Sequence, residues 1–289
     1  MSWLRKKLRK LEKRFGPQIV ERRIGEFNLR MHRDHVLPIK LAKFPNYSAN
    51  VPRIAALLVE KYPGMALVDV GANIGDTVAL VRSKVTCPIV CIEGDEEFFS
   101  LLKGNTSQFK DVTLFSNFVS DGDARMAGEV VRHDGTAHLV ANDGKSVDVT
   151  TLDSLKEQHA AAFENVRLLK IDTDGYDLRV IRGARRLLKT ARPVLFFEYS
   201  PDHMAAVGDH QPMQVFDELG NLGYDRLLFY DNFGRYVLAS SISERAILRE
   251  LTAYAGMDPL RRINYFDIAA FSPPDFEIAE KLRAIELAA

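Results

Sequence analysis

Short apolar runs recur along the chain at intervals that leave room for a helix between them. Runs of this kind, rich in Val, Ile, Leu and Phe, are typical of strands that are buried on both faces of a parallel sheet. Strands that alternate with helices predict an α/β fold, in which helices cover both faces of a mostly parallel sheet. The runs expected to form strands are 67–70, 88–93, 112–117, 166–171, 194–198 and 266–271.

The first of these strands leads into a glycine loop, 71–75, and then into a segment compatible with a buried helix. Asp76 or Thr77 is expected to cap that helix through a side-chain oxygen. A strand, a glycine loop and a helix in this order are the usual place for a nucleotide-like ligand in an open α/β sheet. The chain is therefore expected to bind such a ligand at this loop.

Four carboxylates, those of Asp69, Glu93, Asp172 and Glu198, stand at or near the carboxyl ends of predicted strands. Carboxylates are costly to bury without partners, and ligands of open α/β sheets bind at these strand ends, so the four together predict a functional crevice. Glu93 follows the glycine loop by about 20 residues, the separation at which an acidic side chain meets the hydroxyls of a ribose. Asn117 ends the next strand, where its amide could read an adenine edge.

The details of the loop argue against a ligand with a pyrophosphate. Asn73 stands where a dinucleotide-binding loop needs its middle glycine, and the acid Asp76 would repel the phosphates. The Gly-Lys-Ser/Thr of the Walker pattern is missing as well. A nicotinamide-dependent oxidoreductase is therefore a poor fit to this loop.

S-adenosylmethionine fits the loop better, because it has a positive centre, a ribose and an adenine but no phosphate. Asp69 and Asp76 would lie near its sulfonium and its amino-acid end, and Glu93 would bind its ribose. Gly71 and Gly75 would allow the backbone to approach the ligand closely. The sequence therefore favours S-adenosylmethionine as the cofactor.

Several further motifs stand in a characteristic order along residues 51–201, namely 69–76, 93–96, 151–153, 169–177 and Glu198. Together they resemble those of the FkbM-type class I S-adenosylmethionine-dependent methyltransferases. Proline is more usual in that family at the position of Gly94, and glutamate at that of Asp174, where the shorter side chain changes the reach of the carboxylate.

The resemblance implies a Rossmann-like sheet of seven strands with an antiparallel final strand. It also implies methyl transfer to an oxygen, often that of a sugar or polyketide hydroxyl. The lead-in 44–53 is similar to that of members associated with bacterial surface glycans, so a sugar hydroxyl of such a glycan or its precursor is the expected acceptor. The expected cofactor-binding residues are Asp69, Gly71, Ala72, Asn73, Gly75, Asp76, Thr77, Glu93, Asn117 and Asp172.

Methyl transfer to a sugar hydroxyl needs a general base or a metal ion, because the hydroxyl is a poor nucleophile at neutral pH. Asp172 is the first candidate for the base, since it ends a predicted strand beside the crevice. Asp174 and Glu198 could assist it or bind a divalent ion with it, because hard cations prefer oxygen ligands. His203, on the loop after the next strand, and His133, in a polar and hairpin-like segment, are the other candidates, and surface or packing roles for both stay open.

The composition adds few constraints. Lys plus Arg and Asp plus Glu both total 39, so the formal charge is zero and the chain as a whole offers no case for binding nucleic acid. Cys87 and Cys91 lack the further ligands of a zinc site and are expected to be small buried hydrophobes. Few cysteines and no signal-like segment favour the cytoplasm, and no apolar run approaches the roughly 20 residues of a membrane span.

The first residues of the chain form a basic and amphipathic pattern. Segment 1–16 has many Lys and Arg but a single acid, and Leu4, Leu8, Leu11 and Phe15 recur at helical spacing. A cationic helix with one apolar stripe suits an anionic membrane surface. The stripe could equally pack on the body of the protein or on a second copy of the chain.

The expected organisation is a basic helix with a lead-in (1–60), a methyltransferase domain (61–272) and a C-terminal helical tail (273–289). The prolines of the lead-in predict a segment that covers one edge of the sheet and could also form part of the pocket mouth. The first hypothesis for function is a cytoplasmic O-methyltransferase, peripheral to the inner face of the membrane if the basic helix binds there. The alternative from another class is a catalytically silent binding module in glycan assembly, and methyl transfer to any acceptor would decide between the two.

Overall fold

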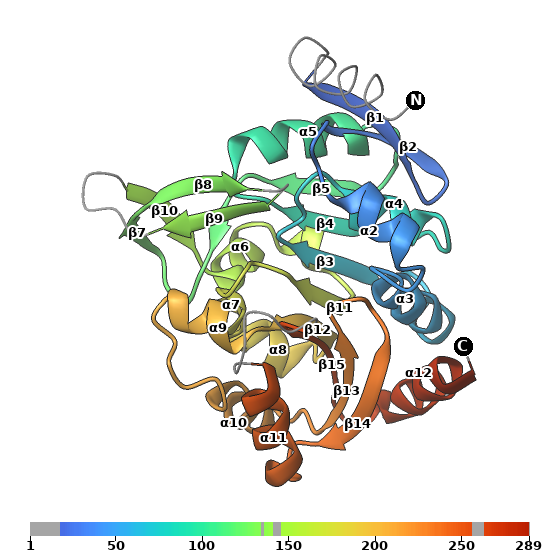
Figure 1. Ribbon diagram of the computed structural model, residues 1–289, viewed down its shortest axis with the longest axis vertical. Helices are drawn as coiled ribbons and strands as arrows, with labels where there is room; N and C mark the ends of the chain where they lie inside the picture. Colours follow the sequence, from blue (N-terminus) through green and yellow to red (C-terminus); the bar gives the residue numbers. More distant parts are fainter. Residues whose placement is uncertain (1–17, 134–135, 141–145, 256–262, 289) are drawn as a thin grey trace, which may run out of the picture.

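The computed structural model describes residues 18–133, 136–140, 146–255 and 263–288 (Figure 1). The basic segment 1–16 lies outside the described residues, so its contact with a membrane or a protein stays a prediction. In the part of the chain that the structure describes, every helix is too short or too polar to cross a bilayer.

An eight-stranded sheet forms the centre of the protein, in the order β14-β13-β15-β12-β11-β3-β4-β5 (Figure 1). Strands β12, β11, β3, β4 and β5 are parallel, and β15 is antiparallel to both of its neighbours, so the predicted α/β class is confirmed. The sheet has one strand more than expected, because the turn after β13 returns the chain as β14, which pairs with β13 at the edge. The strands are β3 Ala66–Val70, β4 Ile89–Ile92, β5 Val112–Phe115, β11 Val166–Ile171, β12 Val194–Tyr199, β13 Arg226–Asp231, β14 Tyr236–Ser241 and β15 Phe266–Phe271.

Helices cover both faces of the sheet, because successive residues of a strand point to opposite sides. Leu67 belongs to the core under one set of helices and Val68 to the core under the other, and the buried free thiols of Cys87 and Cys91 fill part of the Leu67 side, as expected. The Leu67 side is covered by α3 (Asn50–Lys61), α4 (Asp76–Arg82), α5 (Glu96–Thr106) and α12 (Phe276–Ala288). The Val68 side is covered by α6 (Leu152–Gln158), η1 (Ala160–Phe163), α7 (Asp177–Gly183), α8 (Arg185–Thr190), α10 (Gln214–Asn221) and α11 (Arg245–Ala255).

The lead-in packs over α4 and α5, which differs from the expected cover of a sheet edge (Figure 1). Its hairpin buries Leu29 and Met31 against these helices, because that face of the hairpin is apolar. Asn105 of α5 accepts a hydrogen bond from the Arg30 amide (2.7 Å) and donates one to the Ile74 carbonyl (2.8 Å), which ties the hairpin to the glycine loop. The elements of the lead-in are β1 (Ile19–Ile24), β2 (Phe27–His32) and α2 (Leu37–Lys43).

A smaller β region lies between β5 and β11. It consists of a three-stranded sheet in the order β6-β10-β7 and a ribbon of β8 and β9, so the expected hairpin-like character is confirmed. Arg132 of the ribbon pairs with Asp95 at the start of α5 (2.7 Å), which holds the ribbon next to the sheet. The strands are β6 Phe118–Val119, β7 Ala124–Ala127, β8 Glu129–His133, β9 Thr136–Val140 and β10 Ser146–Thr150.

Helix α4 begins without a side-chain cap. Its N-cap residue is Gly75, which has a φ of +86°, and Asp76 is the first residue of the helix. The expected cap by Asp76 or Thr77 is therefore wrong, because the chain passes through the left-handed region immediately before the helix, where glycine is the least strained residue. The carboxylate of Asp76 still complements the positive end of the helix dipole.

Gly71 is required where the loops after β3 and β11 meet. It has a φ of +79°, and a Cβ at this position would lie 2.0 Å from the Asp172 carbonyl oxygen. We expect Gly71→Ala to lower the free energy of unfolding by about 2 to 4 kcal/mol, through backbone strain and overpacking together. Urea unfolding followed by circular dichroism measures the change.

Gly64 offers a matched control for that substitution. It has a φ of +78°, but a Cβ there would have nothing within 4 Å. Gly64→Ala therefore carries the backbone strain alone and is expected to cost about 1 kcal/mol. Equal losses of unfolding free energy in the two variants would contradict this prediction. They would mean that the loops after β3 and β11 can move apart to accept a Cβ at position 71.

Candidate active site

Two cavities open at the carboxyl ends of the parallel strands. The first lies over β3 and β4 and is lined by Glu93 and Asn117. The second, of about 370 Å³, lies over β11 and β12 and is covered by α2 and the segment after it. The two cavities share the walls formed by Gly71, Asn73, Asp172 and Asp174.

Glu93 organises the first cavity. Only 8% of the residue is exposed, and its two carboxylate oxygens accept hydrogen bonds from the Asn73 and Asp95 amides, each at 2.8 Å. Burial raises the pKa of Glu93 to about 7, although these two hydrogen bonds lower it. An ionised carboxylate has about four acceptor positions, so both oxygens can accept further hydrogen bonds from a ligand.

Asn117 and Phe118 form the far wall of the first cavity. A Cβ at Gly94 would lie 2.4 Å from the Phe118 ring, so this ring occupies the space that a side chain at 94 would need. A proline at position 94 would therefore clash with the Phe118 ring in this chain. The arrangement offers a flat apolar surface next to an amide, which suits a planar heterocycle.

Asp69 lines neither cavity. It is fully buried, and its carboxylate accepts a hydrogen bond from Lys170 Nζ at 2.9 Å. The parallel register of β3 and β11 places these two residues directly opposite each other. Burial alone would lower the pKa of Lys170, but Asp69 and Asp172 raise it, so the ammonium stays charged at neutral pH.

Lys170 is a site residue that the sequence reasoning missed. It lines the second cavity and also approaches Asp172 Oδ2 at 3.4 Å. A single lysine inside the apolar run 166–171 was the available signal, because a buried ammonium needs a charged partner.

The remaining residues of the glycine loop divide into two groups. Asp76 and Thr77 line the second cavity together with Asn73, and burial raises the pKa of Asp76. Ala72 is buried in the core, and Gly75 packs against α5, so these two residues shape the loop without reaching either cavity.

Asp172 lies where the two cavities join. About half of its side chain is exposed, in contrast to the buried Asp69 and Lys170 beneath it. It is thus a solvent-accessible carboxylate that a lysine holds at the end of β11. Its position allows contact with ligands in either cavity.

Asp177 is a second residue that the sequence reasoning missed as a contributor to the site. Its Oδ2 accepts hydrogen bonds from the Thr173 hydroxyl (3.1 Å) and the Gly175 amide (3.3 Å), and its Oδ1 accepts one from the Glu198 amide (3.2 Å). Burial raises its pKa to about 7. One buried carboxylate therefore joins the loop after β11 to the end of β12.

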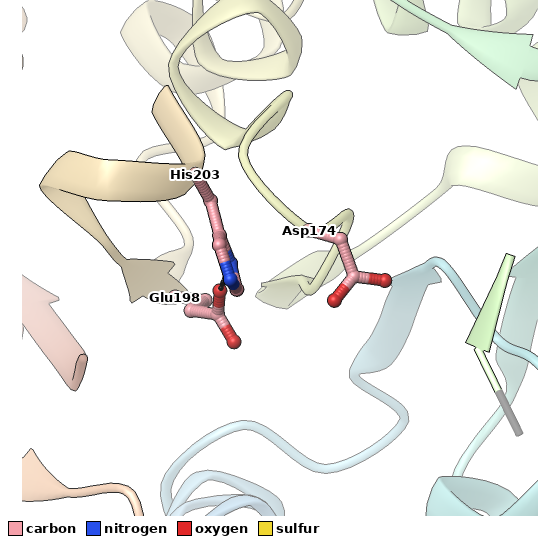
Figure 2. A group of neighbouring side chains, drawn as sticks. All are labelled: Asp174, Glu198 and His203. Carbon is pink, nitrogen blue, oxygen red and sulfur yellow. Dashed lines mark hydrogen bonds and ion pairs between the residues drawn. The ribbon is translucent and has the colours of Figure 1, made fainter. Parts of the chain in front are cut away.

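Glu198 and His203 form a close pair, with Asp174 facing them (Figure 2). His203 Nδ1 lies 3.0 Å from Glu198 Oε1. His203 belongs to α9 (Pro201–Ala206), which packs tightly on the loop, since a Cβ at Gly175 would lie 2.5 Å from the His203 carbonyl oxygen. All four predicted catalytic residues, Asp172, Asp174, Glu198 and His203, line the second cavity.

The lead-in supplies the opposite wall of the second cavity. Lys40 donates a hydrogen bond to the Tyr47 hydroxyl at 3.2 Å. His35 Nδ1 accepts from the Leu37 amide at 3.2 Å, so this imidazole is neutral with its proton on Nε2, and burial lowers its pKa. This wall agrees with the expectation that the lead-in could form part of the pocket mouth, although the sequence pattern did not single out these residues.

The parallel strands with the antiparallel β15 give the sheet the architecture of the class I methyltransferase fold. The family model of the FkbM methyltransferase domain matches residues 69–226, and the chain belongs to that family. The predicted family is thereby confirmed. A comparison with curated proteins gives no match.

Among solved structures, methyltransferase FkbM from Methylobacillus flagellatus is 16% identical, with a TM-score of 0.42 over 62% of this chain and 43% of that chain. The present chain thus spans less than half the length of that relative. N-methyltransferase NodS from Bradyrhizobium japonicum is 8% identical, with a TM-score of 0.40 over 76% of this chain and 92% of that chain. A TehB-like SAM-dependent methyltransferase from Corynebacterium glutamicum is 10% identical, with a TM-score of 0.36 over 78% of this chain and 87% of that chain.

Proposed function

We propose that this protein is an S-adenosylmethionine-dependent O-methyltransferase that acts on a sugar hydroxyl of a bacterial surface glycan or its precursor. The observation that carries the proposal is the junction of the two cavities at Gly71, Asn73, Asp172 and Asp174. A cofactor with its adenosine in the first cavity would present its methyl group to an acceptor in the second. In-line transfer requires this arrangement.

The residues of the first cavity suit the adenosine part of the cofactor. Glu93 would accept hydrogen bonds from the ribose hydroxyls, Asn117 would bind the adenine edge, and Phe118 would pack on its plane. Asp76 and Thr77 would meet the amino-acid end, where the carboxylate of Asp76 complements the ammonium and sulfonium charges.

The residues of the second cavity suit a neutral sugar. Tyr47 and Tyr265 offer aromatic surface and hydroxyls, while the carboxylates accept hydrogen bonds from sugar hydroxyls. Asp172 would remove the acceptor proton as the oxygen forms its bond to the methyl carbon. The carbon–sulfur bond breaks in the same step and its electron pair stays on sulfur, which leaves S-adenosylhomocysteine, an O-methyl product and a protonated Asp172.

Two measurements on the full chain test this proposal. Calorimetry should detect binding of S-adenosylmethionine and S-adenosylhomocysteine. Labelled methyl groups should pass from S-adenosylmethionine to members of a panel of sugar nucleotides and lipid-linked oligosaccharides. Failure of the folded protein to bind either cofactor form would refute the proposal, whereas binding without transfer to any acceptor would favour a catalytically silent binding module.

The affinity for S-adenosylhomocysteine should depend on pH through Glu93. Its pKa of about 7 lies above the ordinary value, so the carboxylate is mostly protonated at pH 6 and mostly ionised at pH 8. Because the ionised form is the better acceptor for ribose hydroxyls, the Kd should rise about tenfold as the pH falls from 8 to 6. Calorimetry at several pH values measures this change.

Glu93→Gln is the matched variant for that measurement. It should bind about tenfold more weakly than the wild type at pH 8 and show a flat profile down to pH 6, because its amide does not ionise. Asp177, whose pKa is also about 7, is retained in this variant and serves as an internal control. A pH dependence that survives in Glu93→Gln would assign the effect to another group and contradict the role of Glu93.

A further inference from the structure

The cluster of Asp174, Glu198 and His203 brings three potential metal ligands from three separate elements to one wall of the second cavity (Figure 2). One donor atom from each residue lies within 4.8 Å of the other two. We propose that this cluster is a binding site for a hard divalent cation of the Mn²⁺ or Mg²⁺ type.

The separations of the donor atoms suit octahedral coordination. With bonds of about 2.1 Å, adjacent ligands of such an ion lie about 3 Å apart and opposite ligands about 4.2 Å apart. The 3.0 Å between His203 Nδ1 and Glu198 Oε1 fits an adjacent pair. All three donor atoms lie within 4.8 Å of one another, which is close to the separation of opposite ligands. Two carboxylates with one imidazole favour Mn²⁺ over Mg²⁺, because Mn²⁺ accepts a nitrogen ligand more readily than Mg²⁺ does.

The charge of the cavity supplies an independent argument. Besides the two acidic ligands, Asp76, Asp172 and Asp267 face the same space. The described cations on its walls are Lys40 and Lys170, and the latter is already paired with Asp69. Carboxylates in a partly enclosed cavity repel one another strongly, so a divalent cation supplies charge that the protein itself lacks there.

The surroundings hold the ligands in place before any ion binds. Asp177 connects the loop that carries Asp174 to the amide of Glu198, and Gly175 allows α9 to bring His203 against that loop. Side chains fixed in this way lose little conformational entropy on binding an ion. Only 7% of the Glu198 side chain is exposed, so it cannot easily turn away to solvent.

The use of this ion rests on the proposed function, whereas its binding does not. An ion at the cluster would contact the acceptor oxygen beside Asp172 and lower the pKa of that hydroxyl, so that a carboxylate could remove its proton. This would assign Asp174, Glu198 and His203 to acceptor activation and leave proton removal to Asp172.

Manganese binding to the full chain tests the site directly. After treatment with a chelator, the protein is titrated with Mn²⁺ alone, and the free ion is measured by electron paramagnetic resonance. We expect one site per chain that Mg²⁺ displaces at higher concentration. His203→Ala and Asp174→Asn, which alter side chains that are not fully buried, should each weaken Mn²⁺ binding at least tenfold.

Asp267→Asn is the matched control, because it alters a carboxyl group of the same cavity that is not one of the three proposed ligands. It should weaken binding by less than threefold. Absence of Mn²⁺ binding at millimolar concentration would overturn the proposal. A loss in Asp267→Asn as large as in the ligand variants would also overturn it, since the cavity would then act only as a diffuse negative surface.

Calorimetry with S-adenosylhomocysteine separates this proposal from the proposed function. His203→Ala, measured in excess chelator, should retain cofactor affinity within threefold, because His203 lines only the second cavity. Mn²⁺ binding by a chain that fails to bind the cofactor would support the metal site and refute the methyltransferase proposal. Cofactor binding without Mn²⁺ binding would refute the metal site and leave the methyltransferase proposal supported.

Discussion

Replacing Asp172 by asparagine is expected to lower the rate of methyl transfer by 10²- to 10⁴-fold, the range typical of a general base. The asparagine side chain is similar in shape but cannot accept the acceptor proton. Asp172 and Asp174 both line the two cavities, but Asp172 also ends β11 beside Lys170, with about half of its side chain exposed. The measurement is the turnover of labelled S-adenosylmethionine with the acceptor that the panel identifies.

The readouts of that experiment distinguish a catalytic role from a structural one. Asp172→Asn should keep its unfolding midpoint and bind S-adenosylhomocysteine within about tenfold of the wild type, with the loss confined to kcat. Asp202→Asn serves as the control, because this exposed aspartate of α9 lines neither cavity. Retention of more than a tenth of the wild-type rate in Asp172→Asn would refute its role as the base.

Replacing Lys170 by methionine is expected to lower the free energy of unfolding by about 3 to 5 kcal/mol, because it leaves a buried carboxylate without its counter-ion. Asp69 is fully buried, and the Lys170 side chain is 10% exposed, so water cannot replace the lost partner. Chemical unfolding followed by circular dichroism measures the loss. Activity should fall as well, since Lys170 also holds Asp172.

Two companion variants show whether that loss comes from the unpaired charge. The double variant Lys170→Met with Asp69→Asn should recover much of the stability, because the remaining buried group is neutral. Arg125→Met breaks an ion pair with Asp148 whose side chains are 73% and 89% exposed, and it should cost at most about 0.5 kcal/mol. A loss for Lys170→Met no larger than that for Arg125→Met would contradict the inferred importance of the buried pair.

The local pattern was sufficient for much of the fold. The apolar runs predicted the parallel strands, because strands buried on both faces are apolar along nearly their whole length. The glycine loop and the strand-end carboxylates Glu93, Asp172 and Glu198 were found for a related reason. Polar residues that interrupt or end buried strands need partners, and they therefore stand out in a single sequence.

Parts of the site depend on segments far apart in the chain. Asp69 was predicted to meet the cofactor, but the register of β3 and β11 places it beside Lys170, 101 residues away. The wall formed by His35, Lys40 and Tyr47 depends on where the lead-in packs. Such contacts depend on the free energy of the whole packed structure and leave little trace in the local sequence.

The sequence by itself determined the α/β class, the glycine loop and the residue types of the crevice, and its motifs identified the family. The class, the loop and the residue types follow from hydrophobic periodicity and from the cost of burying charge, which act on each segment separately. The tertiary structure alone decided which carboxylates are buried and paired, as Asp69 is, and which line a cavity, as Asp172 and Glu198 do. The physical reason is that strand register and loop packing, which are properties of distant segments in contact, set the partner, the solvent and therefore the chemistry of each side chain.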